Sequence, residues 1–124
     1  MLRRSLHSFV QKEIAPHAEE WDRQGGFPHR EIFKRFGELG FLGLNVPEEY
    51  GGAGGDFVST IVYTEEMGQC NAAGMTASVG MHATIVLPYL STLGSEEQKQ
   101  KYLVPGVRGE LIGCLGVTEP NAGS

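Results

Sequence analysis

The last ten residues hold the segment best suited to chemistry. Residues 115–124 read L-G-V-T-E-P-N-A-G-S. Because a proline follows Glu119, helical backbone angles are disfavoured there and an extended course is predicted. Residues 120–123 predict a turn that presents backbone N–H groups and the Ser124 hydroxyl on one side. That surface suits the oxygen and nitrogen atoms of a bound cofactor. The alternative for Thr118 is that its hydroxyl only satisfies the turn.

The four histidines and two cysteines show no metal-site pattern. No H-E-x-x-H motif occurs, and no histidine stands beside a cysteine at ligand spacing. His82 lies between Met81 and Ala83 in the most apolar predicted helix, so a hydrogen-bonded core histidine is expected rather than a ligand. Cys70 and Cys114 are expected to be buried thiols, because their spacing fits neither a zinc knuckle nor a required disulfide.

Carboxylates and glycines offer further candidates. A general base needs burial or a partner to hold its pKa near working pH, and Glu65 and Glu66 are instead predicted on a solvated helix face. The G-G-A-G-G run at 51–55 lacks the G-K-[ST] of a phosphate loop and the spacing of a dinucleotide fingerprint. It is predicted to form a flexible turn or lid hinge, with a phosphate cradle as the alternative.

Hydrophobic periodicity predicts five helices that must hold these residues in place. They cover residues 2–24, 28–39, 57–67, 72–93 and 95–104. We expect a kink or a break at Pro16, a bend at Pro88 and an N-cap at Asp56. The S-E-E-Q sequence at 95–98 is a capping box, and Pro105 is expected to stop the helix that it opens.

The fold class predicted from these elements is all-α. Residues 1–110 are predicted to form an N-terminal helical-bundle domain, and residues 111–124 to begin a β-domain with an extended stretch from Leu111 to Val117. The chain stops at Ser124 inside a glycine-containing turn, where nothing ties its end down. We therefore expect it to be the N-terminal part of a longer protein.

Composition excludes several classes of protein. The 124 residues are 40% hydrophobic and 20% charged, which fits a small soluble domain and not a disordered tail, a collagen-like repeat or a disulfide scaffold. The net charge of −5 and the lack of a basic run disfavour a nucleic-acid partner. Residues 67–95 lack Asp, Glu, Lys and Arg, but they hold too many Gly, Ser, Thr and Pro for a membrane span.

Four motifs, in order along the chain, resemble the acyl-CoA dehydrogenase family. They are V-P-E-E-Y-G-G-A-G-G at 46–55, S-E-E-Q-K-Q-K-Y-L-V-P at 95–105, G-E-L-I-G-C at 109–114 and V-T-E-P-N-A-G-S at 117–124. The resemblance spans essentially the whole chain and is closest to members that act on long-chain acyl groups. It implies an N-terminal helical, a middle β and a C-terminal helical domain, with non-covalent FAD between the β-domain and the helical part.

The resemblance also implies an activity and a site. The activity is α,β-dehydrogenation of fatty acyl-CoA to trans-2-enoyl-CoA, with electrons passing through FAD to an electron-transferring flavoprotein. The implied FAD contacts are Leu115, Gly116, Val117, Thr118, Gly123 and Ser124. Ser124 would also touch the CoA part of the substrate, and family members often carry an aromatic residue where this chain has Leu115. The family's catalytic Glu lies beyond residue 124, so this chain alone is expected to be inactive.

Further expectations follow from the same resemblance. Gly80, Met81, Thr84 and Ile85 would line one wall of the acyl site, with core packing as the alternative for each. The whole protein is expected to be a homotetramer or homodimer in the bacterial cytoplasm or the mitochondrial matrix. Two other functions stay open: an acyl-CoA oxidase or flavin monooxygenase on the same fold, and a cofactor-free helical interaction module.

Overall fold

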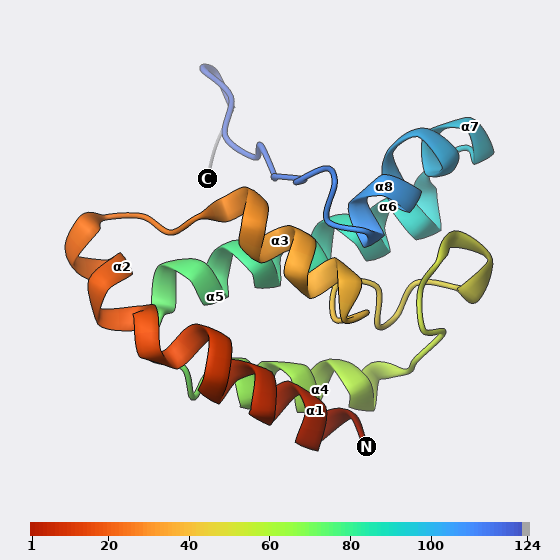
Figure 1. Cartoon of the computed structure of the whole chain (residues 1–124). Helices are drawn as coiled ribbons and strands as arrows, with labels where there is room; N and C mark the ends of the chain where they lie inside the picture. Colours follow the sequence, from red (N-terminus) through yellow and green to blue (C-terminus); the bar gives the residue numbers. More distant parts are fainter. Residues whose placement is uncertain (123–124) are drawn as a thin grey trace.

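The computed structural model describes residues 1–122 as a bundle of helices (Figure 1). The α-helices are α1 (Leu2–Phe9), α2 (Ala18–Gln24), α3 (His29–Glu38), α4 (Phe57–Met67), α5 (Ala73–Gly80), α6 (Leu87–Leu93), α7 (Glu96–Gln98) and α8 (Val104–Val107). Three π-helical turns, η1 (Val10–Ile14), η4 (Met81–Val86) and η5 (Lys99–Leu103), and two 3₁₀ turns, η2 (Ala15–His17) and η3 (Glu48–Tyr50), link or extend them. No strand occurs within residues 1–122, so the all-α fold class is confirmed.

Three prolines lie two residues after the end of a π-helical turn. Pro16, Pro88 and Pro105 follow η1, η4 and η5 respectively. A proline inside a helix clashes with the carbonyl four residues earlier, and here each such carbonyl belongs to the wider π-helical turn. The break expected at Pro16 is confirmed by η1 and η2. The stop expected at Pro105 is wrong, because helical structure continues to Val107.

An aromatic cluster forms the part of the core where α1 meets α3. The rings of Phe9 and Phe36 meet edge to face, with 4.7 Å between centroids, and Phe41 packs against both. All three side chains are buried. Along one edge of the bundle α1 lies beside α4 (Figure 1). The apolar stripe of α1 therefore packs under α3 and α4 together, as its amphipathic sequence requires.

The backbone of α3 touches the end of α8. A Cβ atom at Gly37 would lie 2.3 Å from the carbonyl of Arg108, and one at Gly109 would lie 2.1 Å from the Phe33 carbonyl oxygen. Gly109 also has a φ of +73°, which residues with a side chain rarely adopt. These glycines let α3 pack directly on the turn that leads into residues 111–122.

The glycine-rich run at 51–55 is a hydrogen-bonded turn. The N–H groups of residues 52–55 donate to carbonyls of residues 43–47 at 2.7–3.2 Å. A Cβ atom at Gly52 would lie 2.0 Å from the Val46 carbonyl oxygen. The predicted turn is confirmed, and its flexibility and its role as a lid hinge stay predictions. The phosphate-cradle alternative fails for residues 52–55, because those N–H groups are already used.

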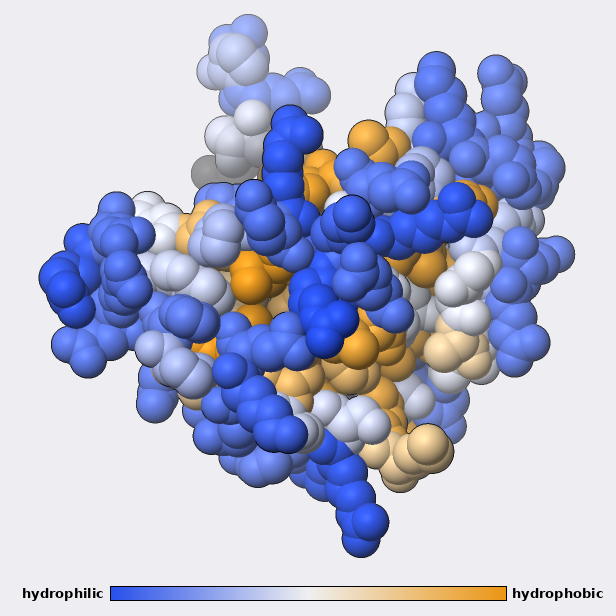
Figure 2. All heavy atoms as spheres, in the orientation of Figure 1, coloured by the Kyte–Doolittle hydropathy of each residue, from blue (hydrophilic) through white to orange (hydrophobic). Residues whose placement is uncertain are grey.

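Residues 111–122 leave the bundle as an extended segment (Figure 1). In the space-filling view this end of the chain stands clear of a mostly hydrophilic face, with apolar atoms visible in the seams between helices (Figure 2). Glu119 and Ala122 pair across a tight turn, which confirms the turn predicted there as far as residue 122. The extended course over 111–117 is confirmed as well, and its assignment to a β-domain stays a prediction. Among residues 1–122, no helix has the length and apolarity needed to cross a membrane.

Candidate functional site

The predicted flavin-contacting residues lie together on the extended segment. Leu115, Gly116, Val117 and Thr118 are consecutive and exposed. Leu115 and Val117 are 51% and 74% exposed, so the segment presents two apolar side chains to solvent. Exposure of apolar side chains to water is unfavourable. Such side chains therefore suit contact with a flat aromatic group. Gly123 and Ser124, the other two predicted contacts, lie outside the described residues.

His82 anchors the start of this segment to the bundle. The residue lies in η4 and is 1% exposed. Its Nδ1 atom accepts a hydrogen bond from the Gly113 N–H at 3.0 Å, and its Nε2 atom lies 3.1 Å from the Gly106 carbonyl oxygen. Since a backbone N–H can only donate, Nδ1 carries no proton and Nε2–H donates to Gly106. The imidazole is therefore neutral and held in one tautomer.

The surroundings of His82 favour this neutral form. Burial lowers the pKa of His82 below its ordinary 6.5, against the opposing effect of the bond to Gly106. The Phe33 ring stands on edge to the imidazole, with 5.2 Å between centroids. Gly113 fits closely against the same turn, because a Cβ atom there would lie 2.5 Å from Val86 Cγ1. The expected core histidine is confirmed, and its bond to Gly113 is a contact that sequence reasoning missed.

An apolar stripe runs along η4 and α6. Met81, Ile85, Tyr89 and Leu93 recur every four residues and are all exposed, and a shallow apolar groove lies beside the last three. Core packing is therefore wrong for Met81 and Ile85, two of the four predicted acyl-wall residues. The other two, Gly80 and Thr84, are half-buried, and the Thr84 hydroxyl donates to the Gly80 carbonyl at 2.8 Å.

Comparison with known proteins identifies the family of this chain. Residues 1–110 match the family model described as acyl-CoA dehydrogenase, N-terminal domain. The chain belongs to the acyl-CoA dehydrogenase family. A probable acyl-CoA dehydrogenase of Bacillus subtilis is 46% identical over 127 residues, covering 100% of this chain and 32% of its own length. The long-chain specific mitochondrial acyl-CoA dehydrogenase of Mus musculus is 40% identical over 124 residues. The match covers 100% of this chain and 28% of the mouse protein.

Solved structures of acyl-CoA dehydrogenases share the fold. The enzyme from Geobacillus kaustophilus has a TM-score of 0.89 and 41% identity, over 98% of this chain and 31% of that one. A glutaryl-CoA dehydrogenase from Mycobacterium smegmatis in complex with FADH2 has a TM-score of 0.88 and 32% identity. The match covers 99% of this chain and 31% of that one. The predicted N-terminal helical domain of this family is thereby confirmed, and the chain spans about a third of the length of these relatives.

The extended segment has the features that the family's flavin requires. An isoalloxazine ring offers a flat apolar face and an edge of hydrogen-bonding atoms. Leu115 and Val117 supply exposed apolar contact, and the Thr118 hydroxyl follows directly. A Cβ atom at Gly116 would meet nothing within 4 Å, so the backbone there is open to a ligand. The described part of the segment therefore fits one wall of an acyl-CoA dehydrogenase flavin site.

The burial of Glu66 contradicts the solvated helix face that was predicted for Glu65 and Glu66. The Glu66 side chain is 4% exposed; Oε1 accepts from Arg3 Nη1 at 2.8 Å, and Oε2 lies 2.9 Å from His7 Nδ1. The hydrogen bond from His7 and then that from Arg3 lower the pKa of Glu66 against the effect of burial. Glu65 stays exposed and also pairs with Arg3. The prediction fails for Glu66 because α1 lays these basic side chains across α4.

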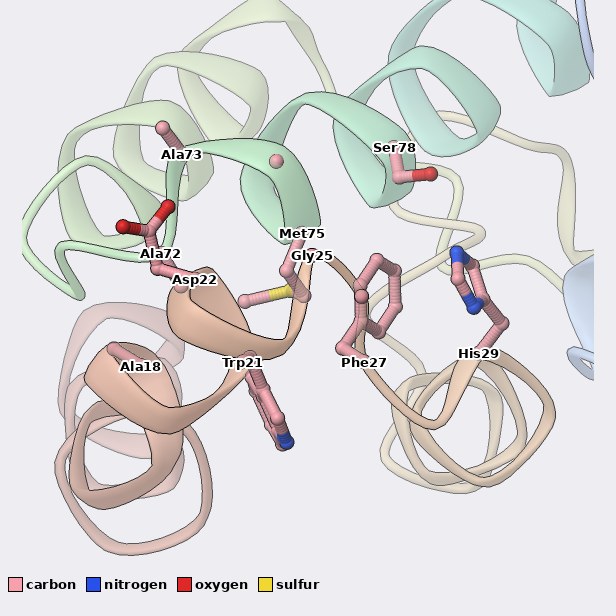
Figure 3. Close-up of a pocket in the computed structure, with 12 residues that line it drawn as sticks. Ala18, Trp21, Asp22, Gly25, Phe27, His29, Ala72, Ala73, Met75 and Ser78 are labelled. Atoms are coloured by element: carbon pink, nitrogen blue, oxygen red, sulfur yellow. The ribbon is translucent and has the colours of Figure 1, made fainter.

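A separate cavity of about 370 Å³ lies between α2, the loop after it and the start of α5 (Figure 3). Trp21, Phe27 and Met75 line it, and no residue of η4 or of 111–118 does. Within residues 1–122, no three His, Cys, Asp or Glu side chains gather in a way that could hold a metal ion. The cavity is therefore separate from residues 115–118.

The two cysteines differ in environment. Cys70 is buried, and its thiol lies 3.0 Å from the Met67 carbonyl oxygen. Cys114 is exposed, next to the anchored Gly113. The expectation of two buried thiols is therefore wrong for Cys114, because the extended segment leaves the bundle at this point.

Proposed function

We propose that the protein carrying this chain is an FAD-dependent dehydrogenase that converts fatty acyl-CoA thioesters to trans-2-enoyl-CoA. One observation carries the proposal: in a chain of this family, the exposed apolar segment 115–118 leaves the bundle at a point fixed by a buried side chain. Bound FAD would supply the acceptor for the β-hydride, and a carboxylate of the whole protein would take the α-proton. The electrons then pass to an electron-transferring flavoprotein.

Each predicted contact has a role in this proposal. Leu115, Gly116 and Val117 lie along the ring, and Thr118 donates a hydrogen bond to its polar edge. Gly123 and Ser124 hold the pyrophosphate side, and Ser124 also touches the CoA part of the substrate. These roles rest on the family relationship and on the exposure of residues 115–118.

The apolar stripe on η4 and α6 supports a fatty acyl substrate. Ile85, Tyr89 and Leu93 border a groove of apolar character, as an alkyl chain requires. The long-chain preference follows from the motif resemblance, and relatives of similar identity include long-chain and short-chain specific enzymes. We place Met81 and Ile85 on the wall that the acyl chain contacts. A homo-oligomer in the bacterial cytoplasm or the mitochondrial matrix completes the proposal, since its relatives include bacterial and mitochondrial enzymes.

A spectroscopic titration of the complete gene product tests this function. The purified protein should be yellow or take up FAD, and long-chain acyl-CoA added without oxygen should bleach the visible flavin band. Short-chain acyl-CoA should bleach it less. A protein that binds no flavin, or a flavin that no acyl-CoA reduces, would contradict the proposal. Rapid peroxide formation without an added electron acceptor would instead favour the acyl-CoA oxidase alternative.

A further inference from the structure

We propose that His82 is a positioning residue for the flavin site. Through two hydrogen bonds it fixes the point at which segment 115–118 leaves the bundle. This inference rests on the proposed function, because it assumes that residues 115–118 contact FAD. His82 itself is buried in η4 and acts through the backbone of Gly113.

The two hydrogen bonds of His82 hold both ends of the stretch that joins α8 to residues 115–118. Nε2–H donates to Gly106, within α8, and Nδ1 accepts from Gly113, inside the extended segment. A shift of the imidazole therefore moves both ends. Gly113 lies two residues before Leu115, about 7 Å along an extended chain, so a displacement at Gly113 passes directly to the predicted flavin contacts.

The bond to Gly113 is the last hold that the bundle has on this segment. Leu111 N–H donates to the Pro105 carbonyl at 3.3 Å, and Gly113 N–H donates to His82 at 3.0 Å. Within the described chain, no later hydrogen bond joins residues 114–118 to the helices. Van der Waals contact adds to this hold, because Gly113 packs against Val86 with no room for a Cβ atom.

The imidazole of His82 is held in place by the residues packed around it. His82 is 1% exposed, and the edge of Phe33 and the chain of α8 enclose it. Both ring nitrogens are satisfied, so rotation of the imidazole would leave the Gly106 carbonyl and the Gly113 N–H without this partner at once. The neutral tautomer is the one arrangement that serves a donor and an acceptor on opposite sides of the ring.

Two substitutions of His82 separate positioning from core packing. In His82→Asn, Oδ1 stands the same number of bonds from Cβ as Nδ1 and can still accept from Gly113. In His82→Gln, Nε2 replaces the ring Nε2 and can still donate to Gly106, while no acceptor remains at the position of Nδ1, because Oε1 is one bond farther from Cβ. Each variant loses one buried hydrogen bond, and only the second releases the segment.

The experiment uses the complete gene product and measures the FAD Kd, the position of the visible flavin band and the unfolding temperature. We expect His82→Gln to raise the FAD Kd roughly five- to tenfold, as the loss of one hydrogen bond implies, and to shift the band. His82→Asn should stay near the wild type in both. Val79→Ala is the matched control, because Val79 is fully buried in α5, three residues before His82, and its truncation should lower only the unfolding temperature.

A second pair of variants keeps the test valid if a His82 variant fails to fold. Gly113→Ala places a Cβ atom 2.5 Å from Val86 Cγ1 and should displace the segment while His82 stays intact. The double variant with Val86→Ala opens that space and should recover most of the FAD affinity. Unchanged FAD affinity in Gly113→Ala, or a loss of affinity that Val86→Ala does not recover, contradicts the positioning role.

The outcomes distinguish this inference from the proposed function. If the wild-type protein binds no FAD, both are overturned. Alternatively, the wild-type protein binds FAD that acyl-CoA bleaches, while His82→Gln keeps the wild-type Kd and spectrum. That result overturns only the positioning role. Equal loss of affinity in His82→Asn, His82→Gln and Val79→Ala also overturns it, because the effect then follows the stability of the bundle.

Discussion

Arg3 of α1 donates a hydrogen bond to Glu66 of α4 at 2.8 Å, across 63 residues of sequence. The carboxylate is 4% exposed while the guanidinium is 53% exposed, so a surface cation satisfies a buried anion. His7 occupies the second carboxylate oxygen at 2.9 Å. Removal of either partner leaves a buried charge with fewer hydrogen bonds, which is costly in a low-dielectric interior. This cluster therefore ties the first helix to α4.

The first prediction concerns the stability that the cluster of Arg3, His7 and Glu66 adds. We expect Glu66→Gln to lower the urea midpoint of unfolding well below that of Glu65→Gln, because Glu65 is half exposed and Glu66 is buried. The stabilisation is present above the ordinary Glu pKa of 4.5 and is lost as pH falls through the lowered pKa of folded Glu66. Urea titrations at neutral and acidic pH measure both effects. Equal midpoints for the two variants would show that the cluster adds no stability.

The second prediction concerns His82 and pH. Because burial lowers its folded pKa below 6.5, the unfolded chain binds more protons than the folded one in mildly acidic solution. Stability should be full above 6.5 and should fall below it, by up to about 1.4 kcal/mol per pH unit. The difference in unfolding free energy between wild type and His82→Asn isolates this contribution. A difference that does not change between neutral and mildly acidic pH would contradict it.

The third prediction tests the aromatic core. Phe36→Ala removes a fully buried ring that packs edge to face with Phe9 and against Phe41. We expect a loss of about 3–5 kcal/mol, a large share of a small domain's stability. Leu39→Ala, at an exposed position just after α3, should cost about 0.5 kcal/mol or less. Chemical denaturation of both variants measures the contrast, and similar losses would place the core elsewhere.

The fourth prediction compares two glycines with the same backbone conformation. Gly40 and Gly109 have φ values of +74° and +73°. A Cβ atom at Gly40 meets nothing within 4 Å, whereas one at Gly109 lies 2.1 Å from the Phe33 carbonyl oxygen. Gly40→Ala should therefore cost about 1–2 kcal/mol of backbone strain. Gly109→Ala should cost about 1–3 kcal/mol more, since α3 must move away from α8. Thermal unfolding of the pair checks this, and equal costs would argue against the close approach.

Local signals placed several helix boundaries correctly. The Asp56 side chain accepts from the Ser59 N–H, and Ser95 and Gln98 form the reciprocal capping box, as the sequence predicted. These features depend on residues three apart, so they can be derived from the chain itself. Pro105 misled the prediction, because η5 widens the helix before it and lets the chain continue.

Three site features depended on contacts between distant residues. Glu66 is buried because α1 returns across α4, and Cys114 is exposed because the segment after Gly113 leaves the bundle. The link from His82 to Gly113 joins residues 31 apart, and no spacing rule connects them. Burial and hydrogen-bond partners of this kind are properties of packing, which a single sequence does not encode in any short window.

The family, the all-α class and the turn at 119–122 could be predicted from the amino-acid sequence, because ordered motifs, periodicity and turn residues are local. The burial and pairing of polar side chains, and the place where residues 115–118 leave the bundle, follow from tertiary packing. The physical reason is that desolvation and hydrogen bonding depend on neighbours brought together by folding: His82 becomes an anchor once η4 packs against the chain beyond α8.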